Sequence, residues 1–378
     1  MKVLCLEPWD GGSHRSFLDE WSNHSRHHWT RLGLPPRRWK WRMRHSALTL
    51  AEEVESRLSA GESWDLLLCS DMLDLATFRG LVPGLEVEAT VVYFHENQLT
   101  YPVREEAERD LHFAFTNFTT ALAADAVWFN SDFHRREFLG ALEDFLGRMP
   151  DHRPQGAVEA IEVKSQIEPP GILPPPSGGR SLGDGPLHLL WAARWEFDKD
   201  PETFFQALFQ LQDLGVHFRL SVLGESFRQS PQIFSVARER LAHHIVRWGY
   251  EASRDDYQRA LAEAEVVVST ARHEFFGIGM VEAMAAGCRP LLPRRLAYPE
   301  LLSGVPSGEV EEFFYEGESA ELARRLVRLA DSREEGRLWP GPEDRCSAEM
   351  ARFFWPGRAR EMDDGLEALA EGRGERRS

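Results

Sequence analysis

The stretch HEFFGIGMVEAMAAGC, residues 273–288, is the most informative part of this 378-residue chain for its fold class. It follows the run VVVST at 266–270, whose β-branched residues predict a buried strand of a parallel sheet. After Gly277 the pattern changes to Met, Val and Ala residues, which predict a helix that is buried on all sides. A buried strand, a glycine turn and a buried helix in succession are typical of an α/β fold.

Two carboxylates, Glu274 and Glu282, stand eight residues apart in this stretch. No Lys or Arg lies at helical spacing from Glu282, so we expect its partner elsewhere in the fold or in a ligand. The N–H groups from Gly277 to Met280 would lack intrahelical acceptors and could bind phosphate. Carboxylates for sugar hydroxyls beside amides for phosphate suggest a nucleotide-sugar site. The alternative is a core helix with an ion-paired glutamate.

Strands alternate with helices on both sides of a proline- and glycine-rich segment, EPPGILPPPSGGRSLGDG, at residues 168–185. We therefore expect two Rossmann-like domains, each with a doubly wound parallel sheet. Their expected ranges are 1–176 and 177–346, followed by a C-terminal helix and a frayed tail at 347–378. Within the first domain we expect a helix from about residue 16, a strand at 29–34 followed by a basic loop, strands at 89–94 and 126–129, a helix at 105–123 and a strand at 161–167.

Polar residues at the carboxyl ends of the predicted strands are candidate site residues. Gly12 and Ser13 lie in the turn after the first strand, and His95 follows the strand at 89–94. Arg194 and Lys199 lie in the connection after the first strand of the second half. A guanidinium fork and a mobile ammonium group together suit the two phosphates of a nucleoside diphosphate. The alternatives are a capping role for His95 and surface pairing with neighbouring acids for the two cations.

The net charge of −17 argues against a protein coated with basic residues for nucleic acid. One segment, RLGLPPRRWKWRMRH at 31–45, nevertheless contains basic and Trp residues and no acid. Guanidinium groups beside indoles suit phosphates and unstacked bases. The candidate RNA-binding residues are Arg37, Arg38, Trp39, Lys40, Trp41, Arg42 and Arg44. The alternative is a solvated loop that pairs with the surplus of acids.

No apolar run approaches the roughly 20 residues that a membrane span needs. The N-terminal MKVLCLEPWDGG enters a strand-like segment directly, so we expect no signal peptide. Four scattered cysteines show no metal-type pairing and predict reduced thiols. We expect a cytoplasmic protein with no membrane partner and no bound metal.

Several segments, taken in order, resemble one family along nearly the whole chain. They are EPWDGGSH, LPPRRWKWRMRHSAL, SDMLDLATFRGL, YFHENQLTYPV, WAARWEFDKDPETFF, SVLGESF and HEFFGIGMVEAMAAGC. The broader pattern resembles the retaining GT-B glycosyltransferases of family 4, and the narrower one resembles the tRNA-queuosine α-mannosyltransferases. The resemblance implies a GT-B fold with two Rossmann-like domains that face a central cleft. It also implies transfer of mannose from GDP-mannose to queuosine in the anticodon of tRNA-Asp, without a metal or another cofactor.

Carried onto this chain, the resemblance implies that Arg194 and Lys199 hold the diphosphate. Glu274 would bind sugar hydroxyls, and Glu282 would bind the ribose diol. The backbone amides that complete the phosphate site would be those of Phe276, Gly277 and Ile278.

The same resemblance implies that Gly12 and Ser13 face the donor across the cleft and that His95 lies near the reacting carbon. Two alternatives stay open. One is a family 4 enzyme that acts on a non-RNA acceptor, and the other is a catalytically silent GT-B protein that only binds RNA.

Overall fold

The computed structural model describes residues 1–103, 109–176, 185–227 and 230–377, with side chains up to residue 372. The first residues of the helix expected at 105–123 and most of the second half of the linker expected at 168–185 lie outside these ranges. The chain forms two compact units: unit 1 is Met1–Gly171 with Trp355–Ser378, and unit 2 is Ile172–Phe354. This division differs from the expected segments because the C-terminal residues from Trp355 onward pack on the first unit.

Unit 1 is built on a parallel six-stranded sheet in the order β2-β1-β3-β4-β5-β6. The strands are β1 (Lys2–Glu7), β2 (His28–Gly33), β3 (Leu66–Ser70), β4 (Ala89–Phe94), β5 (Ala126–Phe129) and β6 (Ser165–Ile167). Every residue of β3, β4 and β5 is buried, as their continuous apolar runs predict for strands covered on both faces. The strand order reverses between β1 and β3.

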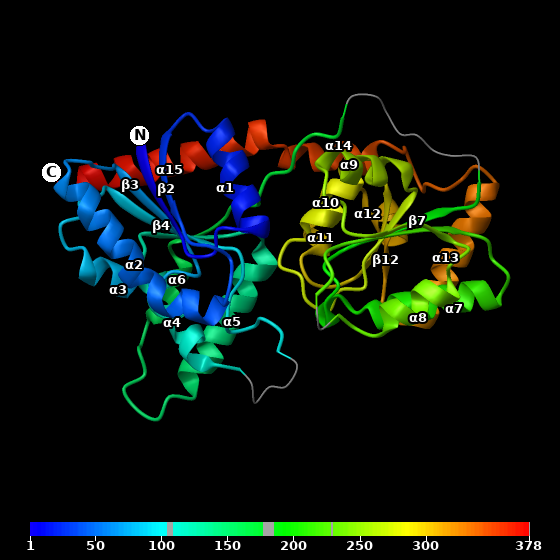
Figure 1. Ribbon diagram of the computed structural model, residues 1–378, viewed down its shortest axis with the longest axis horizontal. Coiled ribbons are helices and arrows are strands. Elements are labelled where there is room, and N and C mark those ends of the chain that lie inside the picture. Colours follow the sequence, from blue (N-terminus) through cyan, green and yellow to red (C-terminus); the bar gives the residue numbers. More distant parts are fainter. Residues whose placement is uncertain (104–108, 177–184, 228–229, 378) are drawn as a thin grey trace. The chain divides into compact units, whose positions relative to one another are not determined.

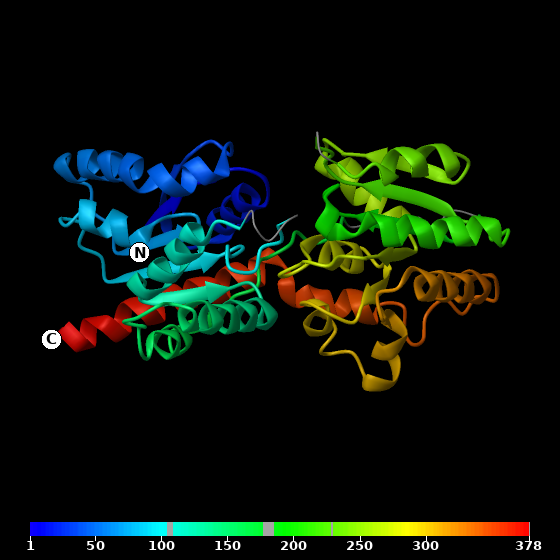
Figure 2. The same ribbon diagram turned by 90° about the horizontal axis from the view of Figure 1, so that it is seen from below.

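Helices cover both faces of this sheet (Figures 1 and 2). They are α1 (Gly12–His24), α2 (Trp39–Ser59), α3 (Leu75–Leu81), α4 (Leu111–Ala123), α5 (Asp132–Gly147), α6 (Ala157–Glu162) and α15 (Trp355–Arg377). The C-terminal α15, red in Figure 1, runs beside α1, and the Trp21 indole N–H donates to Asp363 Oδ1 at 3.0 Å.

Three local expectations for unit 1 are wrong. α1 begins at Gly12, four residues before the expected start. The expected strand at 161–167 is strand only from Ser165, because α6 precedes it and uses Ile161 as a buried helical residue. The expected strand at 29–34 corresponds to β2, but the basic loop expected after it is helical from Trp39 onward, where it forms the first two turns of α2.

Unit 2 contains a second parallel sheet in the order β12-β11-β10-β7-β8-β9. The strands are β7 (His188–Ala192), β8 (Arg219–Leu223), β9 (Ile245–Gly249), β10 (Val266–Val268), β11 (Arg289–Pro293) and β12 (Phe314–Tyr315). Successive strands run outward from β7 to one side and from β10 to the other, which is the Rossmann order. The reversal lies between β7 and β10.

The helices and turns of unit 2 lie on both faces of its sheet (Figure 2). They are η2 (Phe197–Lys199), α7 (Pro201–Asp213), α8 (Ile233–Arg240), α9 (Arg254–Glu263), α10 (Ile278–Ala285), α11 (Tyr298–Leu301), α12 (Ser307–Val310), η3 (Glu311–Phe313), α13 (Ser319–Glu334), α14 (Arg345–Met350) and η4 (Ala351–Phe353). Leu189 and Trp191 of β7 enter one apolar core and Leu190 enters the other, since side chains alternate along a strand. The two sheets confirm the α/β fold class with two Rossmann-like domains.

Among the helices that the structure describes, none is both long enough and apolar enough to cross a bilayer.

Candidate active site

The carboxyl ends of β7 and β10 border a pocket in unit 2. These strands are neighbours from which the chain departs in opposite directions, and such a reversal leaves a ligand crevice beyond the strand ends. The residues around it come from β7, β10, η2 and the start of α10, and they include Ala192, Lys199, Ser269, Glu274, Gly277 and Gly279. The segment singled out from the sequence therefore does border the expected kind of site.

Lys199 and Glu274 form the charged centre of this pocket. The Lys199 Nζ donates to Glu274 Oε2 at 3.2 Å and to the His273 carbonyl at 2.7 Å, and it pairs with Asp198 Oδ2 at 3.2 Å. Burial disfavours the ammonium, but Glu274 and Asp198 outweigh it and raise the pKa of Lys199. Burial likewise opposes the Glu274 carboxylate, yet Lys199 lowers the pKa of Glu274. Both groups are charged at neutral pH. The Glu274 side chain is 28% exposed, so a ligand can reach it.

The start of α10 offers backbone donors beside this pair. Gly277 caps the helix with φ +93° and no side-chain cap is present. Within the described residues, the N–H groups of Ile278 and Gly279 have no acceptor, whereas Met280 donates to the Gly277 carbonyl and drops out of the expected set. A Cβ on Gly277 would lie 2.9 Å from the Tyr298 ring, and one on Gly279 would lie 3.1 Å from the Ala192 carbonyl oxygen. Close packing therefore favours glycine at both positions, and the positive φ favours it at Gly277 as well.

Two further residues that we predicted to bind the donor substrate lie in the segments around this pocket. Phe276 precedes α10, and Arg194 follows β7. Phe276 is buried and packs against Phe353, so only its backbone is available to a ligand. Arg194 lies in the β7–α7 connection with Lys199, pairs with Glu196 Oε2 at 3.2 Å and leaves half of its side chain exposed. Its exposure permits it to turn toward a ligand.

Glu282 is ion-paired within unit 2. The Tyr257 hydroxyl donates to Glu282 Oε2 at 2.9 Å, and Arg254 contacts Oε1 at 3.1 Å. Burial raises the pKa of Glu282 and Arg254 opposes that rise. The prediction that its partner comes from elsewhere in the fold is confirmed, and the partners lie on α9. Its role toward a ribose diol stays a prediction.

A second polar cluster lies at the strand-order reversal of unit 1. Glu7 ends β1 and is fully buried, and it accepts hydrogen bonds from the Trp9 N–H at 2.7 Å and the Ser70 hydroxyl at 3.0 Å. The His14 Nδ1 lies 3.2 Å from Glu7 Oε2. Burial disfavours the imidazolium, but the Glu7 carboxylate raises the pKa of His14 to about 9. A cation and an anion therefore meet beneath the start of α1.

His95, the catalytic candidate, stacks on His14 with ring centroids 3.9 Å apart. Its backbone N–H donates to Asp71 Oδ1 at 2.9 Å. Burial, with the charge on His14 second, holds the pKa of His95 well below its usual range. The cluster thus pairs a cationic imidazole with a neutral one, and the neutral His95 can accept a hydrogen bond.

Sequence reasoning did not find Glu7, His14 or Asp71. The signal was present, because Glu7 and Asp71 end or follow predicted strands and His14 follows the Gly-Gly turn. The ligand atoms of Glu7, His14 and His95 lie within 4.8 Å of one another, a spacing that a metal ion could also bridge. The hydrogen bond between Glu7 and His14 accounts for their contact, and metal independence stays a prediction.

Gly12 and Ser13 open α1 in unit 1 and are exposed. Gly12 has φ +54°, and open space surrounds its missing Cβ. Gly11 before it is confined instead, since a Cβ there would lie 2.3 Å from Pro36 Cγ. The turn thus presents backbone to solvent, and its contact with a donor stays a prediction.

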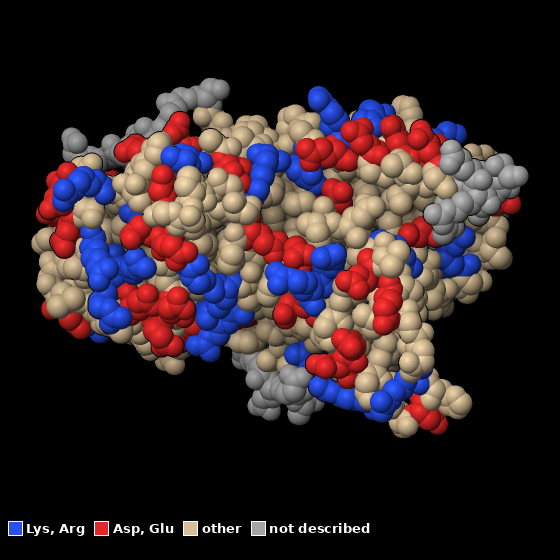
Figure 3. Space-filling view, turned by 180° about the vertical axis from the view of Figure 1, so that it is seen from behind, with Lys and Arg blue, Asp and Glu red and all other residues tan. Residues whose placement is uncertain are grey.

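The basic residues at 37–44 form the positive end of α2. The helix has no side-chain cap and no acid in its first turn. Arg37, Arg38, Lys40 and Arg44 are exposed, so their charges add to the partial positive charge of the helix N-terminus. Elsewhere, on the face in Figure 3, basic and acidic groups are interspersed.

Arg42 and the two Trp residues of this segment differ in their surroundings. Arg42 is buried and its Nε donates to the Pro35 carbonyl at 2.9 Å, so it serves the fold. Trp39 packs against Phe113 with centroids 5.2 Å apart. Trp41 is 60% exposed and stacks on His45 at 4.9 Å. Trp41 is therefore the better placed of the two for a base.

Comparison with known proteins agrees with both units. The family model "tRNA-queuosine alpha-mannosyltransferase N-terminal" matches residues 2–172, and "Glycosyl transferases group 1" matches residues 186–332. A tRNA-queuosine alpha-mannosyltransferase of Drosophila melanogaster is 36% identical over 310 residues, which cover 79% of this chain and 81% of that protein. The chain belongs to the tRNA-queuosine α-mannosyltransferase family. It is accordingly a glycosyltransferase.

Solved structures share the fold at much lower identity. Sucrose-phosphate synthase from Thermosynechococcus elongatus aligns with a TM-score of 0.73 and 17% identity, covering 98% of this chain and all of that one. Anabaena Alr3699/HepE, solved in complex with UDP, aligns with a TM-score of 0.67 and 15% identity over 97% of this chain and all of that one. These relatives confirm the GT-B fold class expected from the sequence.

Proposed function

We propose that this enzyme transfers mannose from GDP-mannose to queuosine in the anticodon of tRNA-Asp, with retention of the anomeric configuration. The observation that carries the proposal is the Lys199–Glu274 pair at the strand-order reversal of unit 2, beside the uncapped start of α10. Family membership supports the acceptor, since the Drosophila relative is a tRNA-queuosine alpha-mannosyltransferase by name. A tRNA acceptor also favours a cytoplasmic location.

The donor chemistry follows from where charge develops. Glycosyl transfer passes through an oxocarbenium-like state while negative charge grows on the leaving diphosphate. Lys199, Arg194 and the N–H groups of Ile278 and Gly279 would receive that charge in positions fixed before the reaction. Glu274 keeps its ionised form through Lys199 and would accept hydrogen bonds from sugar hydroxyls.

Retention follows in this proposal from attack on the face that the diphosphate leaves. A phosphate oxygen would accept the proton of the attacking hydroxyl, so no side chain needs to act as the nucleophile. His95 is neutral because burial and His14 depress its pKa, and it would hold a sugar hydroxyl near the reacting carbon.

The acceptor would bind through the exposed start of α2. Arg37, Arg38 and Lys40 would contact tRNA phosphates, which need cations but no particular base. Trp41 would stack on an unpaired base of the anticodon loop. Arg42 has no part in this contact, because its side chain is buried in the fold.

The direct test is mass spectrometry of nucleosides from tRNA incubated with the protein and a panel of sugar nucleotides. We expect a hexose added to queuosine with GDP-mannose, and none with tRNA that lacks queuosine. Glu274→Gln protein is the matched control and should leave the tRNA unmodified. A hexose transferred only from another donor would contradict the donor assignment, and an unmodified queuosine with every donor would contradict the acceptor.

We also predict that transfer needs no metal. Lys199, Arg194 and the α10 amides can together neutralise the diphosphate, so the rate should be the same with and without excess EDTA. A loss of activity in EDTA that Mg²⁺ or Mn²⁺ restores would count against this site.

A further inference from the structure

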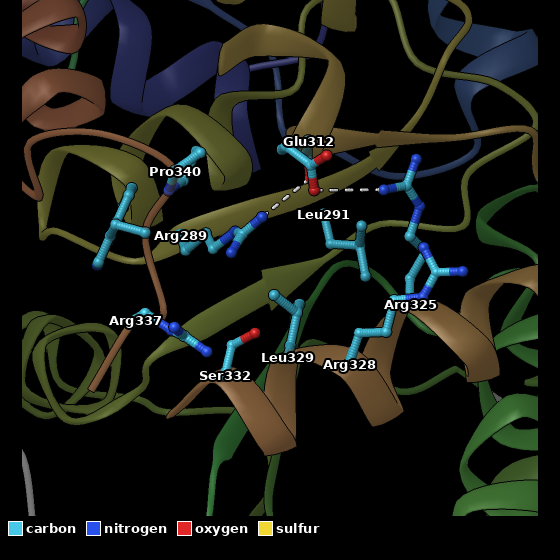
Figure 4. Close-up of a pocket in the computed structure, with 10 residues that line it drawn as sticks. Arg289, Leu291, Glu312, Arg325, Arg328, Leu329, Ser332, Arg337 and Pro340 are labelled. Atoms are coloured by element: carbon cyan, nitrogen blue, oxygen red, sulfur yellow. Dashed lines mark hydrogen bonds and ion pairs between the residues drawn. The ribbon is translucent and has the colours of Figure 1, made fainter. Parts of the chain in front are cut away.

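Unit 2 has a second hollow beside the amino end of β11, whereas the Lys199–Glu274 pair lies at the carboxyl ends of β7 and β10. The hollow has a volume of about 250 Å³, opens to solvent and is bordered by the first residue of β11, by α13 and by the segment after α13. Four arginines, one hydroxyl and one carboxylate border it: Arg289, Arg325, Arg328, Arg337, Ser332 and Glu312. Figure 4 shows Glu312 between Arg289 and Arg325. On a chain of net charge −17, this is a concentration of cations in a recess.

Arg289 forms the buried wall of this hollow. It is 4% exposed, and its terminal nitrogens donate to the carbonyls of Leu338 and Glu312, the latter at 3.0 Å. Its Nε is buried and has no acceptor among the residues that the structure describes. A buried guanidinium with an unused donor is costly, and an anion in the hollow beside it would offset part of that cost through its charge.

The other arginines leave the hollow with excess positive charge. Arg325 reaches Glu312 Oε2 only at 3.5 Å, and Arg337 pairs with Glu335. Arg328 has no ion-pair partner within the described part of the chain. Burial, aided by the charge of Arg325, lowers the pKa of Arg289 to about 10 against the opposing charge of Glu312. One bordering carboxylate, Glu312, therefore faces four guanidinium groups, and a second carboxylate, Glu335, pairs with only one of them.

We infer that this hollow binds the terminal phosphoryl group of a small phosphate monoester. Guanidinium forks match phosphate oxygens, and the Ser332 hydroxyl adds a neutral donor. A terminal phosphoryl group carries close to two charges and can enter a recess, whereas a phosphodiester carries one charge and is flanked by two sugars. This favours a monoester over an RNA backbone. The site differs from the donor site, which lies at the carboxyl ends of β7 and β10.

Titration calorimetry with inorganic phosphate, phenyl phosphate and dimethyl phosphate tests the inference at constant ionic strength. The variant replaces two exposed arginines, Arg328→Gln with Arg337→Gln, and leaves the structural Arg289 in place. Arg324→Gln is the matched control, since Arg324 is exposed on α13 but does not border the hollow. The parent, the double variant and Arg324→Gln all have the same donor site, so phosphate binding there is the same in each. A difference in affinity between these proteins therefore reports binding in this hollow.

We expect phenyl phosphate to bind at least as tightly as inorganic phosphate, and dimethyl phosphate to bind at least about tenfold more weakly. The double variant should lose at least about tenfold in affinity for the first two, and Arg324→Gln should match the parent. Equal binding by parent and double variant would overturn the site. Dimethyl phosphate binding as tightly as phenyl phosphate would overturn the monoester in favour of a backbone phosphate. If the double variant melts below the parent, Arg328→Gln alone supports the same comparison.

Discussion

Lys199 and Arg194 lie in one connection and are both assigned to the diphosphate, but they differ in burial. Arg194 is half exposed, so Arg194→Ala should lower the transfer rate by a factor of about 10²–10³, some 3–4 kcal/mol, and leave the melting temperature unchanged. Lys199→Met should also lower stability, by about 3–5 kcal/mol, because Asp198 and Glu274 would lose their buried cation.

Initial rates and thermal melts of the two variants test this contrast. Arg259→Ala, which removes an exposed arginine of α9 paired with Asp256, should behave as the parent in both measurements. Normal turnover of Arg194→Ala at saturating donor would remove Arg194 from the diphosphate site.

The His14–Glu7 pair makes stability depend on pH in a defined window. The pKa of His14 is about 9 in the fold and 6.5 is its ordinary value, so the folded protein holds the proton more tightly. Its contribution is complete below about pH 6.5 and is lost as the pH rises through about 9, with a maximum of about 3 kcal/mol. His95 acts in the opposite sense and only at lower pH, since its pKa is depressed.

Urea unfolding of the parent and of His14→Gln between pH 6.5 and about 9.5 checks this prediction. The parent should lose its advantage over the variant across that window. A constant difference between the two proteins would show that His14 is not protonated in the fold.

At the scale of elements, α2 is where the sequence was hardest to interpret. Pro35, Pro36 and the dense basic residues predicted a loop up to residue 45, although the helix begins at Trp39. The buried face of α2 starts at Arg42 and Met43. Because an arginine occupies a buried position, the sequence does not show the apolar periodicity of a helix there. The strand β4 was predicted at its observed bounds, because a continuous apolar run indicates a buried strand of a parallel sheet without any knowledge of the neighbouring strands.

The helical start of α2 sharpens the test of RNA binding. Arg37→Gln, Arg38→Gln and Lys40→Gln together should weaken tRNA binding and reduce its salt slope by about two to three, because each phosphate contact releases about one counterion. Arg57→Gln, at the other end of the same helix, is the control and should change neither.

Filter binding of queuosine-containing tRNA over a range of salt concentrations gives both quantities. Donor binding without tRNA should be the same in all variants. An unchanged salt slope in the triple variant would show that this segment is a solvated helix end.

At the scale of the whole molecule, the two parallel sheets and the site segment at 273–288 could be predicted, since both depend on patterns within short stretches. The packing of α15 on unit 1 could not, because its partners in and just after α1 are more than 300 residues away in sequence. Asp363 accepts from the Trp21 indole, the Ser25 hydroxyl and the Arg26 N–H at 3.0, 2.9 and 2.8 Å. The residues of the Glu7–His14 contact are similarly joined only once β1 and α1 are folded together.

Asp363→Ala should therefore destabilise unit 1 by about 3 kcal/mol, because three donors lose a charged acceptor and one of them, the Trp21 indole, is buried. Hydrogen exchange should rise in α1 and α15 and stay the same in β7 and β10. Asp364→Ala, which alters an exposed neighbour on the same helix, is the control. Equal protection of α1 in the parent and in Asp363→Ala would contradict this role for α15.

The return of α15 to unit 1 also sets an order of events during synthesis. A ribosome releases the strands of the first sheet early, but the helix that covers α1 only after all of unit 2 has been translated. The N-terminal half must therefore wait with the apolar side of Phe17 and Trp21 unprotected, while unit 2 can close as a continuous insert. Unit 1 thus begins before unit 2 in the chain and completes its fold after it, and chaperones have the longer access to unit 1.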